Sequence, residues 1–372
     1  MNIALLGFGV VGRGVYDLTK KIPEMTVTKV VCLEDVELPD ATVTRDFKQV
    51  LTDDVDLVVE AMGGLHPAYE FVTAAMEAGK HVVTSNKALV ATYYDTLLPL
   101  AQSKGICFRC TAAVGGGIGW LSELERTCRT QKLLRVGGIM NGTCNYILDS
   151  MTRLGLTYAD ALSQAQKLGY AEANPTTDVE GIDTWHKVLL SSNIGFGVSL
   201  DPATVPVTGI SRISKEDVAC FAEHGLVCKL ISTGKQEGGV YSAWVHPTLV
   251  KAGSLEAAVP ANYNLITFEG EASGPMSLYG QGAGRYPTAH NVVQDMADVL
   301  AGKGFYCGYG QKVQAVNSQK LRFYVRGGSD SWLEENTAER WGEAVITKPV
   351  AVAQMHSWIK GRSDAFMAAL AE

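Results

Sequence analysis

The chain has 372 residues, of which 47% are hydrophobic and 19% charged. This composition supports two or three packed units and excludes an intrinsically disordered chain. The formal net charge of −7 argues against a nucleic-acid surface, which needs an excess of lysine and arginine. There is no signal-peptide pattern, and no apolar run approaches the ~18 residues of a membrane span. We therefore expect a cytoplasmic protein with small-molecule ligands that binds neither nucleic acid nor membrane.

Residues 1–115 alternate strand-like and helical stretches. The sequence predicts strands at Asn2–Leu6, 26–33, 55–60 and His81–Thr84. It predicts helices at 10–22 and 67–78, the second closed by Gly79. Such an alternation indicates an α/β fold in which helices cover both faces of a parallel sheet, as in a Rossmann dinucleotide-binding domain.

A GxGxxG motif lies between the first strand and the first helix. In such a turn the first glycine permits the tight bend, the second lets the backbone approach a pyrophosphate, and the third allows close packing of helix on strand. We expect the cofactor to contact Gly7, Phe8, Gly9, Val10, Val11 and Gly12.

The second predicted strand is followed by Glu34, 22 residues beyond Gly12. A carboxylate there can accept a hydrogen bond from the ribose 2′-hydroxyl of NAD and would repel the 2′-phosphate of NADP. No arginine or lysine lies next to Glu34 in the sequence, so we expect none beside it to bind that phosphate. NAD is therefore favoured over NADP, while two solvated loop acids without a ligand remain an alternative.

Beyond residue 115 the pattern changes to glycine-rich turns, longer helices and fewer strands of the parallel type. We expect an α+β domain for substrate binding and dimerisation at 116–285, with helices at 159–168 and 183–193. A helix at 288–300, within a returning stretch of about 286–310, completes the first domain. Residues 311–372 form a separate C-terminal segment.

Four separated segments resemble the homoserine dehydrogenase family. These are residues 60–64 with 79–88 (GKHVVTSNKA), 141–148 (NGTCNYIL), 168–187 (LGYAEANPTTDVEGIDTWHK) and 280–289 (GQGAGRYPTA). The third is the most specific, because a generic dehydrogenase does not need that run. The resemblance spans residues 1–310 and implies NAD(P)-dependent interconversion of L-homoserine and L-aspartate 4-semialdehyde by a homodimer, in threonine and methionine biosynthesis.

The resemblance also implies roles for single residues. Lys187 would exchange the proton with the substrate oxygen through water, and Lys87 would lie between nicotinamide and substrate. A lysine suits proton transfer when burial or nearby positive charge lowers its pKa toward neutrality. Asp183 lies four residues before Lys187, so both share one helix face. Further substrate contacts are implied for Glu172, Asp178, Asp183, Gly142 and Thr143, and further cofactor contacts for Gly63, Thr84, Ser85, Lys87 and Gly284.

The sequence departs from the family at a loop similar to EAxVGGGxP. Thr111 stands in place of the glutamate that helps to hold a monovalent cation there, and Gly119 in place of the proline. A hydroxyl is neutral, so the cation would lose its charged ligand. Any site at the carbonyls of Val114, Gly116 and Ile118 is expected to be weak or absent, and no other metal site is expected.

Two alternatives stay open at this point. Thr111, Gly119 and Asn174, which replaces a usual aspartate, allow a related oxidoreductase acting on another small hydroxy-amino acid. A dinucleotide-binding protein without catalysis is the other alternative, although it would have no need for the two lysines. Residues 321–326 resemble the opening strand of the family's regulatory domain. Because 46 residues follow, we expect a shortened version without threonine feedback inhibition.

Overall fold

The computed structural model describes residues 1–304 and 309–371 and contains two compact units. The first unit comprises residues 1–131, 193–199 and 280–311, and the second comprises residues 132–192, 200–279 and 312–372. The expected three-part division remains a prediction. Part of the expected returning stretch, residues 305–308, lies outside the described residues.

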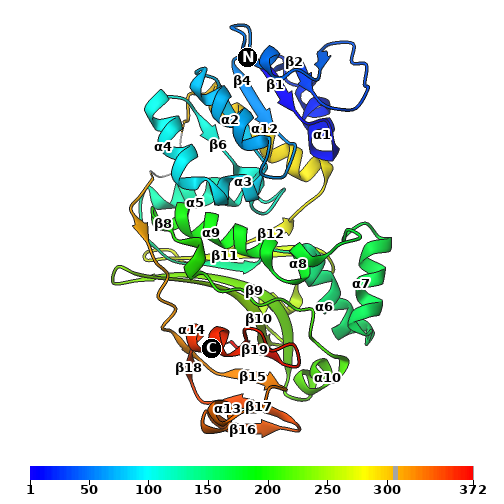
Figure 1. Ribbon diagram of the computed structural model, residues 1–372, viewed down its shortest axis with the longest axis vertical. Helices are drawn as coiled ribbons and strands as arrows, with labels where there is room; N and C mark the ends of the chain where they lie inside the picture. Colours follow the sequence, from blue (N-terminus) through cyan, green and yellow to red (C-terminus); the bar gives the residue numbers. More distant parts are fainter. Residues whose placement is uncertain (305–308, 372) are drawn as a thin grey trace. The chain divides into compact units, whose positions relative to one another are not determined.

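The first unit is built on a six-stranded sheet in the order β3-β2-β1-β4-β5-β6, and every pairing in it is parallel. This confirms the expected α/β class with a Rossmann sheet, drawn in blue and cyan in Figure 1. The strands are β1 (Asn2–Leu6), β2 (Thr26–Val31), β3 (Thr42–Thr44), β4 (Leu57–Glu60), β5 (His81–Thr84) and β6 (Phe108–Arg109).

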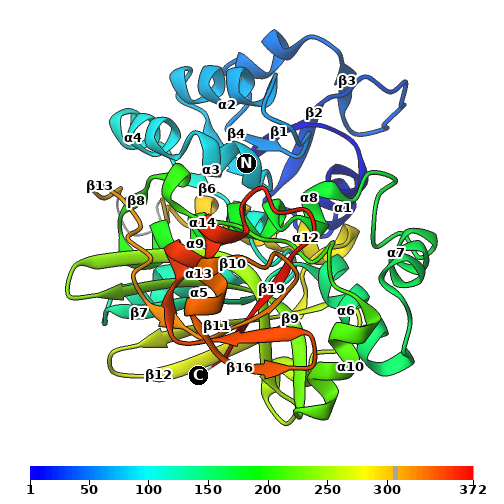
Figure 2. The same ribbon diagram turned by 60° about the horizontal axis from the view of Figure 1, so that its bottom comes forward.

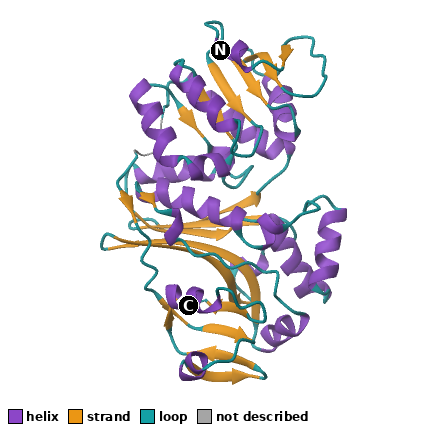
Figure 3. Ribbon diagram, viewed as in Figure 1, coloured by secondary structure: helices purple, strands orange, loops and turns teal. Residues whose placement is uncertain are grey.

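Helices surround this sheet (Figure 3). The central strands are buried on both faces, so they are almost continuously apolar. The helices are α1 (Val10–Thr19), α2 (Ala68–Glu77), α3 (Lys87–Thr92), α4 (Tyr94–Lys104), α5 (Trp120–Cys128) and α12 (Arg285–Leu300), with short 3₁₀ turns at Phe47–Leu51 and Thr111–Ala113.

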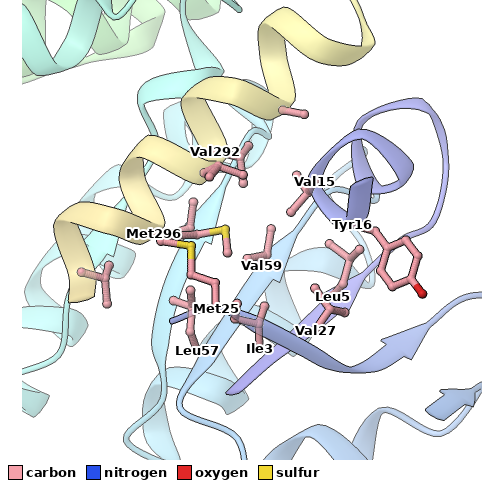
Figure 4. Close-up of a cluster of buried hydrophobic side chains, with 14 of the residues drawn as sticks. Ile3, Leu5, Val15, Tyr16, Met25, Val27, Leu57, Val59, Val292 and Met296 are labelled. Atoms are coloured by element: carbon pink, nitrogen blue, oxygen red, sulfur yellow. The ribbon is translucent and has the colours of Figure 1, made fainter. Parts of the chain in front are cut away.

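Helix α12 is the expected returning helix, and it closes the apolar core of the first unit. Val292 and Met296 project from it toward Leu57 and Val59 of the sheet in a single buried cluster (Figure 4). Helix α1 packs on α12 so closely that a Cβ at Gly14 would lie 2.8 Å from the Cβ of Ala289. The sheet core is therefore complete only when residues from both ends of the unit are present.

The second unit contains a nine-stranded sheet in the order β12-β11-β7-β9-β10-β19-β15-β17-β16. The strands are β7 (Leu133–Ile139), β9 (Leu226–Glu237), β10 (Val240–Lys251), β11 (Tyr263–Gly270), β12 (Gly274–Gln281), β15 (Phe323–Arg326), β16 (Thr337–Trp341), β17 (Ala344–Thr347) and β19 (Phe366–Leu370). The long β9–β10 hairpin turns at Gly238-Gly239, where both residues have positive φ.

The remaining elements of the second unit are short strands and helices. The helices are α6 (Gly142–Leu154), α7 (Tyr158–Lys167), α8 (Thr176–Val179), α9 (Ile182–Phe196, which continues into the first unit), α10 (Lys215–Glu223), α11 (Leu255–Ala258), α13 (Ser331–Glu335) and α14 (Val352–Ile359), with a 3₁₀ turn at Pro202–Thr204. The short strands β8 (Ser199–Leu200) and β13 (Lys312–Val313) pair with each other, as do β14 (Lys320–Leu321) and β18 (Val350–Ala351).

From β15 onward, the C-terminal segment runs through α13, β16, β17, the short strand β18 and α14 to β19. It joins the larger sheet because β19 pairs in parallel with β10 (Figure 2). Trp244 of β10 belongs to the same buried cluster as Phe323, Met355 and Met367 of this segment. The absence of threonine inhibition remains a prediction. Within the described residues, no helix is long and apolar enough to span a membrane.

Candidate active site

In the glycine-rich turn of the first unit, the fold requires glycine at Gly7 and Gly12 but not at Gly9. Gly7 has φ +92°, and a Cβ at Gly12 would lie 2.2 Å from the Gly7 carbonyl oxygen. At Gly9, by contrast, φ is −74° and a Cβ would meet nothing within 4 Å. Protein packing therefore leaves room for a side chain at Gly9, where helix α1 begins. An open backbone of this kind fits the close approach of a dinucleotide pyrophosphate.

A buried carboxylate joins the two loops that were expected to line the nicotinamide. Glu60 ends β4, is fully buried, and accepts hydrogen bonds from the Gly63 amide at 3.1 Å and the Thr84 hydroxyl at 2.5 Å. Asn86 donates from Nδ2 to the Gly64 carbonyl at 2.7 Å. Gly63 and Thr84 thus share Glu60 as a hydrogen-bond partner, and their contact with the cofactor stays a prediction.

Lys87 is the first residue of α3, directly after the expected cofactor residue Ser85 and the N-cap Asn86. The Asn86 side chain accepts a hydrogen bond from the Leu89 amide at 3.1 Å, which fixes where α3 begins. Lys87 and Ser85 are both half-buried. The helix start therefore sets the position of Lys87 at the end of strand β5.

Glu34, at the end of β2, has a basic neighbour after all. The Arg13 guanidinium lies 2.6 Å from Oε2 of Glu34, so the expectation that no arginine or lysine lies beside Glu34 is wrong. Arg13 follows Gly12 in helix α1 and reaches the strand end across the turn. The sequence analysis missed it because the two residues are 21 positions apart.

The loop at residues 111–119, which resembles a cation-binding loop of the family, packs against the glycine-rich segment at residues 280–289. Gly117 donates from its amide to the Gln281 carbonyl at 3.0 Å, and a Cβ at Gly116 would lie 2.5 Å from the Gly282 carbonyl oxygen. Gly284 has φ +120° and is the N-cap of α12. The Asn291 side chain donates from Nδ2 to the Gly116 carbonyl at 2.5 Å, so one expected cation ligand already accepts a hydrogen bond.

A buried ionic network lies beside that loop. Arg109 pairs with Asp295 at 3.0 Å, Asp298 at 2.9 Å and Glu125 at 3.2 Å, and the Arg109 side chain is 1% exposed. Thr111 donates its amide and its hydroxyl to Asp295 at 2.7 and 2.6 Å. Burial raises the pKa of Asp295 to about 6, although Arg109 and Thr111 act in the opposite direction.

In the second unit, Lys187 and Asp183 face each other on α9 as their spacing predicts. The Lys187 ammonium lies 2.8 Å from Oδ2 of Asp183 and donates to the Met140 carbonyl at 2.6 Å. Both side chains are at least nine-tenths buried. A buried ammonium needs acceptors for its N–H groups, and the Asp183 carboxylate and the Met140 carbonyl supply two of them.

Asn141 connects this pair to Asp178. Its Nδ2 donates to Asp178 at 2.7 Å and to Asp183 at 2.9 Å, while its Oδ1 caps helix α6 by accepting from the Cys144 amide at 2.8 Å. One amide side chain thus holds both carboxylates and starts a helix. We call Asn141, Asp178, Asp183 and Lys187 the polar cluster.

Of the other expected substrate residues, Gly142 and Thr143 begin α6 and Glu172 lies in the turn before α8. The Thr143 hydroxyl donates to the Tyr170 carbonyl at 2.5 Å, and a Cβ at Gly142 would lie 2.5 Å from the Asn262 carbonyl oxygen. Glu172 is exposed, and its backbone carbonyl accepts from Gln166. No contact between the Glu172 carboxylate and the polar cluster is described, so its role stays a prediction.

Sequence reasoning missed four residues that organise these groups: Asn141, Glu60, Arg13 and Arg109. Glu60 had a usable signal, because a carboxylate that ends an apolar strand must find partners when it is buried. Asn141 had the weaker signal of an N-cap type before a helix. The partners of Arg13 and Arg109 depend on the tertiary structure.

Comparisons with known proteins show which family the chain resembles. Residues 120–297 match the family model "Homoserine dehydrogenase", and residues 7–110 match "Homoserine dehydrogenase, NAD binding domain". The homoserine dehydrogenase of Corynebacterium glutamicum is 38% identical over 322 residues, which cover 82% of this chain and 72% of the relative. That of Bacillus subtilis is 36% identical over 315 residues, covering 81% and 73%.

Solved structures extend the likeness to the whole chain. The homoserine dehydrogenase from Thiobacillus denitrificans has a TM-score of 0.88 at 29% identity, and the match covers 100% of this chain and 98% of that one. A hyperthermophilic archaeal homoserine dehydrogenase in complex with NADPH has a TM-score of 0.70 at 22% identity, covering 81% and 98%. The second match shows the shared fold.

Proposed function

The chain belongs to the homoserine dehydrogenase family, and on that premise we propose that Lys187 exchanges the proton of the reaction. The family interconverts homoserine and aspartate semialdehyde, an oxidation of a CH–OH group that uses a nicotinamide dinucleotide. The bound nicotinamide supplies or accepts the hydride. The protein must then move one proton to or from the substrate oxygen.

The single observation that carries this proposal is the environment of Lys187. Within the described part of the chain, two partners, Met140 and Asp183, account for two of its three N–H groups. The third can point at a substrate oxygen, and Asp183 stabilises the ammonium whenever the proton returns. A buried lysine fixed by two acceptors is restricted to one orientation, which favours directional proton transfer.

We propose that the polar cluster also binds the substrate. Asp178 and Asp183 are carboxylates that Asn141 holds side by side, and their negative charge is complementary to a substrate ammonium. They suit the substrate ammonium or hydroxyl, and further substrate contacts are proposed for Glu172, Gly142 and Thr143 from the family resemblance. Lys87, on the cofactor-binding unit, is assigned to the substrate carboxylate or carbonyl.

Replacing Lys187 tests the proton role. Lys187→Met keeps an unbranched apolar stem of four atoms and removes the ammonium group. We expect a loss of at least about 10³-fold in kcat, in the upper part of the range for general acid–base groups, followed by absorbance of the reduced nicotinamide. Cofactor binding, measured by the fluorescence of bound NADH or NADPH, should stay within threefold of wild type, as should that of the exposed control Lys167→Met. Activity within tenfold of wild type with normal cofactor binding would contradict the assignment.

For the cofactor we propose NAD in preference to NADP, because the Glu34 carboxylate can accept from a ribose 2′-hydroxyl. The fold itself does not decide, since the archaeal relative of the same fold is in complex with NADPH. A kcat/KM for NADPH equal to or above that for NADH would contradict this preference.

We also propose that activity does not require a monovalent cation. Thr111 offers a neutral hydroxyl in place of a charged carboxylate and donates it to Asp295, and the Gly116 carbonyl accepts from Asn291. The donor set therefore does not fit a bound sodium or potassium ion. Rates in choline chloride should equal those in potassium or sodium chloride at the same ionic strength, and a dependence greater than threefold would contradict the proposal.

A homodimer formed through the second unit is proposed from the family resemblance. The edge strand β12 supports it, because Met276 and Tyr279 are exposed there at 44% and 54%. Light scattering after size-exclusion chromatography tests it directly. Activity on a different hydroxy-amino acid remains the alternative, motivated by Thr111, Gly119 and Asn174, and a substrate panel would distinguish the two.

A further inference from the structure

Arg13 occupies an unusual position in the cofactor-binding turn. It follows the third glycine of the motif, and its amide donates to the Gly9 carbonyl at 3.0 Å in the first turn of α1. Its guanidinium carbon lies 4.8 Å from the centre of the Phe8 ring, and one nitrogen lies 2.6 Å from Glu34. The side chain thus runs from the turn that approaches the pyrophosphate to the strand end that faces the adenosine ribose.

The pair formed by Arg13 and Glu34 is open to solvent. The side chains are 39% and 61% exposed, and exposed ion pairs of this kind contribute little to stability. A phosphate group carries more charge than a carboxylate and matches the planar fork of a guanidinium with two parallel hydrogen bonds. Arg13 can therefore exchange its carboxylate partner for a phosphate without disturbing the core.

We propose that Arg13 determines the specificity of this chain for the 2′ position of the cofactor and that Glu34 keeps it from acting as a phosphate ligand. With Glu34 present, its carboxylate forms an ion pair with the Arg13 guanidinium and accepts a hydrogen bond from the ribose 2′-hydroxyl of NAD. Without the Glu34 charge, Arg13 binds a 2′-phosphate. This inference deepens the proposed preference for NAD and rests on it.

A second pair near the same strand end provides a matched control. Arg45 lies 2.7 Å from Asp35, and these side chains are 63% and 95% exposed. Both residues line a surface hollow with Glu34. Arg45 has the same charge as Arg13 and likewise pairs with an exposed carboxylate, but it lies outside the glycine-rich turn. If general positive charge were enough to bind a 2′-phosphate, removing Arg45 would have the same effect as removing Arg13.

The test uses two adenosine fragments, 2′,5′-ADP and 5′-AMP, whose binding to the purified protein is measured by titration calorimetry. We expect Glu34→Gln to strengthen 2′,5′-ADP binding at least tenfold and to change 5′-AMP binding less than threefold. The double variant Arg13→Met/Glu34→Gln should lose that gain, whereas Arg45→Met/Glu34→Gln should keep it within twofold. The ratio of kcat/KM for NADPH to that for NADH should rise in parallel.

Two results with the variants would overturn the proposal: no gain in Glu34→Gln, or a gain that survives the loss of Arg13. Fragment binding involves no homoserine chemistry. If the fragments behave as expected but the protein fails to reduce aspartate semialdehyde, the proposed function falls and the role of Arg13 stands. A wild-type protein that already binds 2′,5′-ADP more tightly than 5′-AMP would contradict both the NAD preference and the restraining role of Glu34.

Discussion

The glycine-rich turn of the first unit and the polar cluster of the second unit are built in opposite ways. The turn uses backbone groups from six consecutive residues, and its geometry follows from where a Cβ is tolerated. The polar cluster uses charged and amide side chains from the end of β7, from α8 and from α9. A ligand can thus be bound by local chain conformation or by side chains that only the tertiary fold brings together. Substitutions in the two regions should therefore have different effects on stability and on activity.

The largest effect is expected in the polar cluster. Asn141→Leu removes the donor shared by Asp178 and Asp183 and also the cap of α6. We expect the free energy of unfolding to fall by about 2–4 kcal/mol and kcat/KM to fall at least 100-fold. Chemical denaturation and steady-state kinetics measure the two effects.

Asn141→Ser separates the two roles of Asn141. Serine can still cap α6, but its side chain is too short to reach both carboxylates. Most of the stability should return while kcat/KM stays low. Recovery of both quantities would show that the bridge between the carboxylates is unimportant, and the comparison between the two regions would fail.

A smaller effect is expected from a matched pair in the glycine-rich turn. Gly12→Ala places a Cβ against the Gly7 carbonyl and should lower the free energy of unfolding by about 1–3 kcal/mol, as overpacking does. Gly9→Ala meets no protein atom within 4 Å, so its stability should match wild type while NADH binds at least tenfold more weakly. Thermal unfolding and fluorescence titration measure these. Normal NADH affinity in Gly9→Ala would show that the backbone there does not approach the cofactor.

The last effect concerns pH. In the second unit, burial lowers the pKa of His356 to about 3 and that of the adjacent His246 well below its ordinary value of 6.5. Below pH 6.5 the two histidines bind protons in the unfolded state but stay neutral in the folded state. As the pH falls below 6.5, the free energy of unfolding of the second unit therefore decreases by up to about 1.4 kcal/mol per pH unit for each histidine.

Asp295 in the first unit acts with the opposite sign. Its pKa is raised from 3.8 to about 6, so between these values the folded state binds the proton more tightly. Its contribution to stability rises as the pH falls from 6 toward 4. Hydrogen exchange followed by mass spectrometry at pH 7 and pH 5 should show the second unit weakening more than the first. His246→Asn/His356→Asn should reduce that difference, and an equal response of both units would contradict this account.

The same contrast explains how much could be predicted from the sequence. The Rossmann sheet was predictable because its strands are short apolar runs at regular intervals, and β1 and β5 were placed to the residue. The pairing of Asp183 with Lys187 was predictable from helical spacing. The bond from Lys187 to Met140 spans 47 positions, and that from Arg109 to Asp295 spans 186. No local pattern encodes such contacts, so the partners of Arg109 and Arg13 were found only in the folded structure. For Asn141 the sequence could indicate the cap of α6 but not the bridge between Asp178 and Asp183.

Helix α12 gives the first unit a particular folding order. Its residues cover the sheet core from positions 285–300, whereas the sheet itself is finished by residue 109. During synthesis at about 5–20 residues per second, the sheet waits roughly ten seconds or more for the helix that covers it. For that interval Leu57, Val59 and their neighbours form an exposed hydrophobic surface on the nascent chain. We expect this enzyme to depend on chaperones until α12 leaves the ribosome.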